Sequence, residues 1–296
     1  MMTMQTGEGM DREGGDMLNK KIAIVLLAAS LITLAWAQAI HALTEGSAPA
    51  LSAPFPTDPD FKPRLGTYYY GFEFNSMNIG SASISIVKEG ELYRMHVNAR
   101  TNSKIDYVYK IRYKGNNLTD MDPLSPKVTQ ISQTVKSKEK DLVIRFSGDG
   151  SIQTTEKESE PGEPDDSDLR RIHPDRYTVD PFSATYLARG YDWKVGSEEV
   201  FDVYTGKKRY ELRLKCTEKT LVDMGGYRRA AWVIVPVARN LDPAKKPQAQ
   251  KKPADVRIYL SADDFKDVLR IEASHAIGTF LVRLDRFEPG ETLTRP

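Results

Sequence analysis

Apolar and polar residues alternate with a period of two along most of this chain. The clearest stretch is 256–287, where three successive segments place an apolar residue at every second position. Such a period puts one face of a strand against a core and the other toward water. Turn-forming residues at 261–264 and Gly278 separate the three segments. We therefore predict three consecutive antiparallel strands and a chain that is mainly β.

The same alternation recurs upstream. Aromatic residues stand at every second position of 68–74, and serines alternate with apolar residues in 81–86. Residues 103–108 break the pattern and fit one helical turn, whereas 116–126, with two prolines, are typical of a loop. We predict a curved antiparallel sheet, a closed or half-open barrel formed as a meander. Further strands are expected at 93–99, 109–113, 128–135, 142–146, 152–154, 200–203, 210–216 and 231–237.

One short helix is predicted to begin at Asp180. Asp180 suits the N-cap, Pro181 suits the first helical position, and Gly190 suits a left-handed exit. Phe182 and Tyr186 are four positions apart and share one helix face. A helix of this length is not stable alone. We therefore expect its aromatic face to pack against the sheet.

The N-terminal region is typical of an exported protein. Two lysines precede an apolar run, 22–37, and two segments that each end in a small residue follow, at 37–39 and 40–42. This order predicts a signal peptide over residues 1–42 and a periplasmic location. An uncleaved membrane anchor is the alternative, since the run is near the shortest length that spans a bilayer. We place the true start of translation at Met17, which would leave a compact basic segment ahead of the apolar run.

Composition bounds the rest of the chain. Residues 43–64 are rich in Pro, Ala and Ser and predict a flexible lead, followed by one domain at 65–288 and a tail at 289–296. The formal net charge is +1, so no strong long-range field toward nucleic acid or anionic lipid is expected. The mean hydropathy of −0.48 excludes a protein with many membrane spans.

Two polar segments interrupt the pattern of strands. Residues 156–175 are acidic and nearly free of apolar side chains, which predicts a solvated loop. A calcium site is the sharper alternative, although the spacing of the acids does not match an EF-hand. Residues 239–254 hold several lysines and prolines and predict a flexible insertion between two strands. The alternative for this Lys-rich loop is contact with an anionic envelope surface.

No arrangement of residues indicates catalysis. The histidines lack metal-ligand spacing, and phosphate-loop, dinucleotide and nucleophile-elbow motifs are absent, so we predict no metal and no cofactor. Asp263 and Asp264 are neighbours and are most simply turn residues, because adjacent positions point in different directions. Cys216, the single cysteine, falls on the apolar face of a strand and is expected to be a small buried residue.

Four segments together resemble a known family. They are Ile79-Gly80-Ser81-Ala82, the run from Asp180 to Arg189, Leu260-Ser261-Ala262-Asp263-Asp264, and the run from His275 to Phe280. The combination is similar to the DUF3108 family of exported, mostly bacterial proteins of unknown function, and would cover about 65–287. The resemblance implies no catalytic residues. It implies a fold similar to the curved sheet of LolA/LolB-type lipoprotein carriers, and fold alone does not fix function.

Curved sheets of this kind can enclose an apolar ligand. We therefore expect a non-enzymatic envelope protein that binds a lipid, a lipidated partner or another apolar molecule, or that maintains the envelope. The alternatives are an envelope hydrolase acting on glycan or lipid, and a scaffold that recruits an envelope protein through strand edges or the Lys-rich loop. Membrane contact is expected only through the N-terminal segment or that loop. The candidate ligand-binding residues are Tyr70, Phe72, Phe182 and Tyr186, which the same pattern also allows to be core alone.

Overall fold

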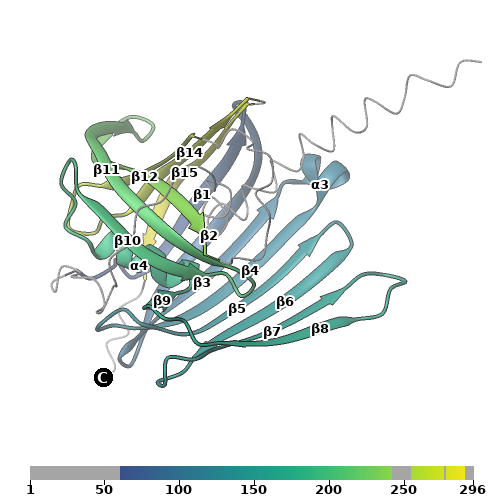
Figure 1. The fold of residues 1–296 in the computed structure, drawn as a ribbon. Coiled ribbons are helices and arrows are strands. Elements are labelled where there is room, and N and C mark those ends of the chain that lie inside the picture. Colours follow the sequence, from purple (N-terminus) through teal and green to yellow (C-terminus); the bar gives the residue numbers. More distant parts are fainter. Residues whose placement is uncertain (1–60, 242–254, 277, 291–296) are drawn as a thin grey trace, which may run out of the picture.

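The computed structural model describes residues 61–241, 255–276 and 278–290. Fifteen strands and two helices form in this part of the chain, and all the strands belong to one sheet (Figure 1). In chain order they are β1 (Gly66–Phe74), β2 (Met77–Glu89), β3 (Leu92–Thr101), α3 (Ser103–Tyr109), β4 (Ile111–Asp120), β5 (Pro126–Val135), β6 (Lys138–Phe146), β7 (Ile152–Ser159), β8 (Asp166–Ile172), β9 (Thr178–Val179), α4 (Pro181–Gly190), β10 (Glu198–Tyr204), β11 (Arg209–Asp223), β12 (Arg228–Asn240), β13 (Asp255–Ser261), β14 (Val268–His275) and β15 (Gly278–Pro289).

The sheet is an antiparallel meander that grows in both directions from its first and last strands. Its order is β8-β7-β6-β5-β4-β3-β2-β1-β15-β14-β13-β12-β11-β10-β9. β1 pairs with β15, and a bulge between Tyr69 and Tyr70 shifts their register. β9 is the exception to the antiparallel pattern, because Thr178 and Val179 pair in parallel with β10. The prediction of a mainly β, curved antiparallel sheet is confirmed.

The two ends of the sheet meet through side chains. Tyr204, at the end of β10, packs with Leu142 and Ile144 of β6 and Ile152 of β7 in a small core of their own. Thr154 Oγ1 donates a hydrogen bond to Tyr204 Oη at 3.1 Å. Strands at the two ends are not hydrogen-bonded neighbours in the sheet order. We call this contact between Tyr204 and the residues of β6 and β7 the closing seam. The sheet is a half-barrel whose ends are joined by side-chain packing and not by strand pairing.

α4 lies in the hollow of the curved sheet, where it contacts β10 and β4 (Figure 1). Most of its ten residues are buried. Phe182 fills the space over Gly115 of β4, and Tyr186 stacks on Tyr93 of β3 with ring centroids 5.7 Å apart. The predicted N-cap at Asp180 and the packed aromatic face are confirmed. The predicted left-handed exit is wrong, because the residue that follows Gly190, Tyr191, ends the helix in extended backbone.

The acidic segment 156–175 is not a solvated loop, because β7 and β8 form a hairpin over most of it. Glu156 is buried, and Lys140 Nζ lies 2.9 Å from its carboxylate. Arg170 of β8 reaches the same carboxylate at 3.6 Å and also donates to the carbonyl of Gly206 across the closing seam. Ion pairs and backbone hydrogen bonds between the strands hold this hairpin in place. Its low content of apolar residues therefore gave the wrong prediction.

The predicted loop at 116–126 is also shorter than expected, since β4 continues to Asp120. Asn117 and Thr119 point inward and are buried, yet both find hydrogen-bond partners there. The break at 103–108 is the helix α3, which is longer than one turn. Cys216 is buried, as predicted.

Several predictions fall on residues outside the described ranges. They are the signal peptide or anchor, the start at Met17, most of the lead 43–64, the Lys-rich residues 242–254 and most of the tail. Phe61 and Arg64, the described end of the lead, pack on the sheet. Neither helix of the described residues has both the length and the apolar character that crossing a bilayer requires.

Candidate ligand cavity and its charged wall

An apolar cavity lies between α4 and the concave face of the sheet. The space between the atoms of its walls measures about 610 Å³, and this volume includes open solvent at the mouth. Thr185, Ala188 and Arg189 of α4 form one side, and alternate residues of seven strands form the other. The strand residues are Tyr70, Ile84, Leu214, Ile234, Ile258, Leu260, Val268, Ile271 and Val282.

A second space, of about 390 Å³ counted in the same way, adjoins the first. The two share Tyr70, Ile84, Thr185, Arg189 and Val268 in their walls, so one hollow runs along the face of α4 that carries Thr185 and Arg189. Two of the helix residues that face the hollow, Thr185 and Ala188, have short side chains that leave the space next to the strands open. The rest of the concave face of the sheet is closely packed, and this packing holds the walls of the hollow in place.

The structure brings two of the four candidate residues to this hollow. Tyr70 borders both spaces and Phe182 borders the second. Phe72 packs on Phe280 with ring centroids 6.1 Å apart, and Tyr186 packs on Tyr93. These two serve as core residues, which the alternation of aromatic residues allowed from the start.

The candidate residues predicted from the sequence did not include those on the helix side of the hollow. Thr185, Ala188 and Arg189 stand at positions i, i+3 and i+4, which share one face of a helix. The small residues Thr185 and Ala188, beside the larger Phe182 and Tyr186, were a readable signal for a gap. Periodicity alone did not say that this face looks into the sheet.

Tyr70 offers the hollow a neutral polar edge. Its hydroxyl donates a hydrogen bond to the carbonyl of Val268 at 3.1 Å. Burial is the main cause that raises the pKa of Tyr70 above its ordinary value. The phenol therefore stays protonated at any physiological pH, and its ring serves as wall.

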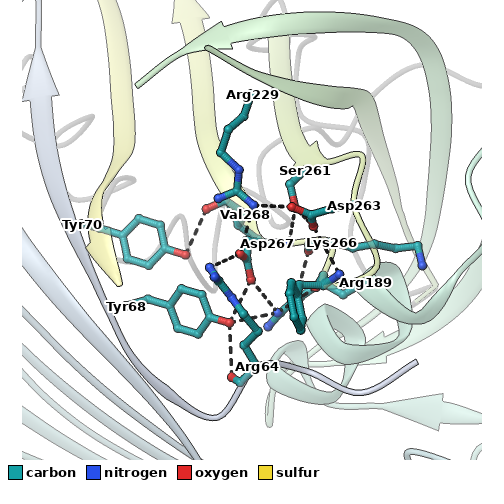
Figure 2. A network of polar contacts seen from close by, with 11 residues as sticks. Arg64, Tyr68, Tyr70, Arg189, Arg229, Ser261, Asp263, Lys266, Asp267 and Val268 are labelled. Carbon is teal, nitrogen blue, oxygen red and sulfur yellow. Dashed lines mark hydrogen bonds and ion pairs between the residues drawn. The ribbon is translucent and has the colours of Figure 1, made fainter. Parts of the chain in front are cut away.

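Behind Arg189 lies a buried charge network centred on Asp267 (Figure 2). Asp267 is fully buried and accepts hydrogen bonds from Arg64, from Arg189 at 3.1 Å and from Arg229 at 3.4 Å. The Tyr68 hydroxyl donates to the same carboxylate at 2.9 Å. Three guanidinium groups therefore converge on one carboxylate behind the wall of the hollow, and of these four groups Arg189 borders the hollow itself.

Arg189 fastens the end of α4 to the β13–β14 turn. Its Nε donates to the carbonyl of Lys266 at 3.1 Å, and its Nη2 donates to the carbonyl of Phe265 at 3.1 Å. Asp263 makes the turn by accepting the backbone N–H of Phe265, as predicted, and also lies 2.5 Å from Arg229. The network thus ties the segment before β1, the helix, β12 and the β13–β14 turn into one support.

A second polar group anchors the start of α4. The buried Asp180 carboxylate accepts the backbone N–H of Phe182 at 2.8 Å and the Ser183 hydroxyl at 2.7 Å. Asn117 of β4 donates to it at 3.2 Å, and Thr119 bonds to Ser183. Burial raises the pKa of Asp180 above its ordinary value. This group fixes the helix at its N-terminus as the Asp267 network fixes it at its end.

Within the described ranges, no cluster of three or more His, Cys, Asp or Glu side chains has the arrangement of a metal site. Burial raises the pKa of the Cys216 thiol, which weakens it as a nucleophile. The buried carboxylates of Asp180 and Asp267 hold structural hydrogen bonds. What the site offers chemically is an apolar space whose wall holds one charged side chain, Arg189, already paired with Asp267.

Comparison with known proteins agrees with this architecture. The chain is similar to the crystal structure of a β-barrel-like protein of the domain of unknown function DUF1849 from Brucella abortus, with a TM-score of 0.53 and 11% identity. The match covers 78% of this chain and 100% of that chain, and at this identity it concerns the fold alone. No curated protein matches the chain. The model of the family described as "Protein of unknown function (DUF3108)" matches residues 67–285, and the chain therefore belongs to the DUF3108 family.

Proposed function

We propose that this protein is a non-enzymatic binding protein of the cell envelope, and that it holds the apolar chain of a lipid or lipidated molecule between α4 and the sheet. One observation carries the proposal: a hollow, set inside an otherwise packed half-barrel, whose first space alone has nine aliphatic side chains in its wall. Apolar cavities stay dry and accept apolar guests. Pockets for small ligands are typically concave and mostly apolar.

Burial of hydrocarbon supplies the affinity in this proposal. Each methylene removed from water contributes about 0.8 kcal/mol. About eight methylenes would therefore contribute about 6 kcal/mol, which corresponds to a dissociation constant between millimolar and micromolar. Such affinity suits a protein that takes up and releases its ligand. The pair of lysines at 20–21, followed by the apolar run at 22–37, supports action after export.

Two substitutions at Thr185 test the proposal. Thr185→Leu places a larger side chain in both spaces and so fills part of them. Thr185→Val keeps the side-chain volume and removes the hydroxyl that bonds to the carbonyl of Pro181. Titration with a fluorescent fatty acid should give saturable binding to the unchanged protein and to Thr185→Val. Thr185→Leu should weaken that binding about tenfold or more, since about two methylenes of ligand lose their place.

Two controls accompany the titration. Thermal unfolding should show that Thr185→Leu is folded at the temperature of the assay, and Ala188→Leu fills the first space from a neighbouring position if it is not. Native mass spectrometry of protein from its own envelope should show a co-purified lipid. The proposal is wrong if the unchanged protein neither retains a lipid nor binds the probe, or if all variants bind it equally.

A further inference from the structure

The short helix α3 stands at one end of the sheet, beyond β3 and β4 (Figure 1). It is rigidly held although seven residues are too few for a stable helix. Asn102 caps it by accepting the backbone N–H of Ile105 at 3.0 Å, and the Asn102 side chain donates to the carbonyl of Asn78 in β2 at 2.8 Å. Arg112 of β4 holds Asp106 with two hydrogen bonds, one of them 2.9 Å long.

This fixed helix presents apolar side chains to solvent. Tyr107 is 95% exposed and Val108 is 47% exposed, while Tyr109 points inward and is buried. Met77, 54% exposed, begins β2 next to the strand residue that bonds to Asn102. Single exposed apolar residues are ordinary. Three exposed apolar side chains grouped around one firmly held helix are less usual and indicate a binding surface.

The same rim is positively charged. Lys104, Lys110 and Lys136 are exposed, and none of them forms an ion pair within the described residues. Lys136 is placed beside α3 because its backbone N–H bonds to the carbonyl of Lys110 at 2.8 Å, and its ammonium lies 5.0 Å from the Tyr109 ring centre. Asp106, the acid of α3, is neutralised by Arg112. Three exposed lysines that form no ion pair within the described residues therefore surround the apolar group.

We propose that this α3 rim, formed by Met77, Lys104, Tyr107, Val108, Lys110 and Lys136, docks on the surface of an anionic lipid bilayer. A tyrosine ring suits the depth of lipid headgroups, and lysines attract anionic lipid while their stems reach the surface. A stable protein interface needs about 20–30 residues on each side, far more than this rim supplies. A second copy of the chain would bring like charges together. The proposal concerns a surface away from the hollow and does not depend on what the hollow binds.

A dye placed on the rim tests the proposal in the full-length chain. Tyr107→Cys is labelled with an environment-sensitive nitrobenzoxadiazole dye, and Tyr227→Cys serves as the matched control. Tyr227 is also an exposed tyrosine, 60% exposed, but it lies in the β11–β12 turn at the opposite ends of the strands. Cys216 is buried and does not compete for the label, which labelling of the unchanged protein verifies. Both variants carry the same N-terminus, so anchoring through it affects them equally.

Vesicles rich in phosphatidylglycerol should brighten and blue-shift the dye at position 107 and leave position 227 unchanged. Each lysine near an anionic surface strengthens binding about fivefold. Replacing Lys104, Lys110 and Lys136 by Gln should therefore raise the lipid needed for half of the change by about tenfold or more, and pure phosphatidylcholine should give little change. No change at 107, or an equal change at both positions, would overturn the proposal. A change at 107 that grows with protein concentration without vesicles would assign the rim to a second copy instead.

Discussion

Arg189 Nη2 lies 3.1 Å from Asp267 Oδ1, and both side chains are buried. The pair joins the last turn of α4 to the start of β14, so it sets the distance between the helix and the strands that enclose the hollow. Arg64 and Arg229 share the same carboxylate. Removing one member of such a group costs more than the pair contributes, because the remaining charges lose their counter-ion in a dry environment.

We expect Asp267→Asn to lower the free energy of unfolding by about 3–5 kcal/mol, because three guanidinium groups then lack their common counter-ion. Urea unfolding followed by circular dichroism measures the loss. Asp192→Asn is the matched control, since it breaks an exposed pair with Lys194 whose side chains are 69% and 78% exposed. That change should cost at most about 1 kcal/mol. Equal losses in the two variants would contradict a central role for Asp267.

Gly115 should resist substitution because of the aromatic ring above it. A Cβ at this position would lie 2.5 Å from Cζ of Phe182, so Gly115→Ala should destabilise the protein by about 1–3 kcal/mol through overpacking. Gly148→Ala, where nothing lies within 4 Å, should change stability by at most about 0.5 kcal/mol.

A double substitution identifies the cause of the Gly115 effect. If the ring is responsible, Gly115→Ala combined with Phe182→Leu should be more stable than the sum of the two separate losses predicts. Denaturant unfolding of all four proteins completes the cycle. Strictly additive losses would show that Phe182 is not the group that the new methyl meets.

The strands were predictable because their signal is local. Alternation over a few residues marks a face, and Asp180 with Pro181 marks a helix start, so neither needs knowledge of distant partners. β8 escaped prediction because its order rests on Glu156 and Arg170, whose charges match only after the hairpin forms. β4 was cut short for a related reason, since its polar inward residues are satisfied by residues of α4.

The site depended on contacts that local patterns do not report. Arg64 and Asp267 are 203 positions apart, and Arg189 and Asp267 are 78 apart. Nothing in the neighbourhood of Arg64 distinguishes it from a solvated residue of a Pro-rich lead. Tyr70 and Phe182 were found because aromatic residues on a sheet face and a helix face tend to lie in the interior. Which of the aromatics border space and which fill it is set by their distant neighbours.

Asp180 should give stability a specific dependence on pH. Burial raises its pKa above the ordinary 3.8, although hydrogen bonds from Ser183 and Phe182 oppose the change. The native state then binds a proton that the unfolded state has released, in the window from 3.8 up to the raised value. The free energy of unfolding must fall as pH rises through that window. The free energy of unfolding of the unchanged protein, measured relative to that of Asp180→Asn, should therefore fall as pH rises above 3.8 and become constant above the raised pKa.

Asp106 supplies a control of opposite sign. Hydrogen bonds from Arg112 lower its pKa to about 2. Its contribution to stability is therefore complete above the ordinary value of 3.8 and is lost as pH falls toward about 2. Urea unfolding at a series of pH values should show the difference from Asp106→Asn growing as pH rises through this lower window. The same slope for both variants would show that burial does not govern Asp180.

The closing seam should open before the rest of the fold. Its core consists of Leu142, Ile144, Ile152 and Tyr204, which form a cluster separate from the main core. Regions with small independent cores open at lower free energy than the whole molecule. We expect Ile144→Ala to speed amide exchange in β6–β8 strongly and in β14 and β15 much less. Ile86→Ala, a buried isoleucine of the main core, is the matched control and should affect β1 and β15 at least as much as β7 and β8.

Hydrogen exchange followed by mass spectrometry distinguishes the two patterns strand by strand. If the seam gives access to the hollow, Ile144→Ala should also speed both uptake and release of the fluorescent fatty acid while its equilibrium affinity stays nearly constant, because the seam residues do not line the hollow. Stopped-flow mixing measures the two rates. Uniform exchange across all strands in Ile144→Ala would mean that the sheet opens as one unit, and unchanged rates would place the entrance elsewhere.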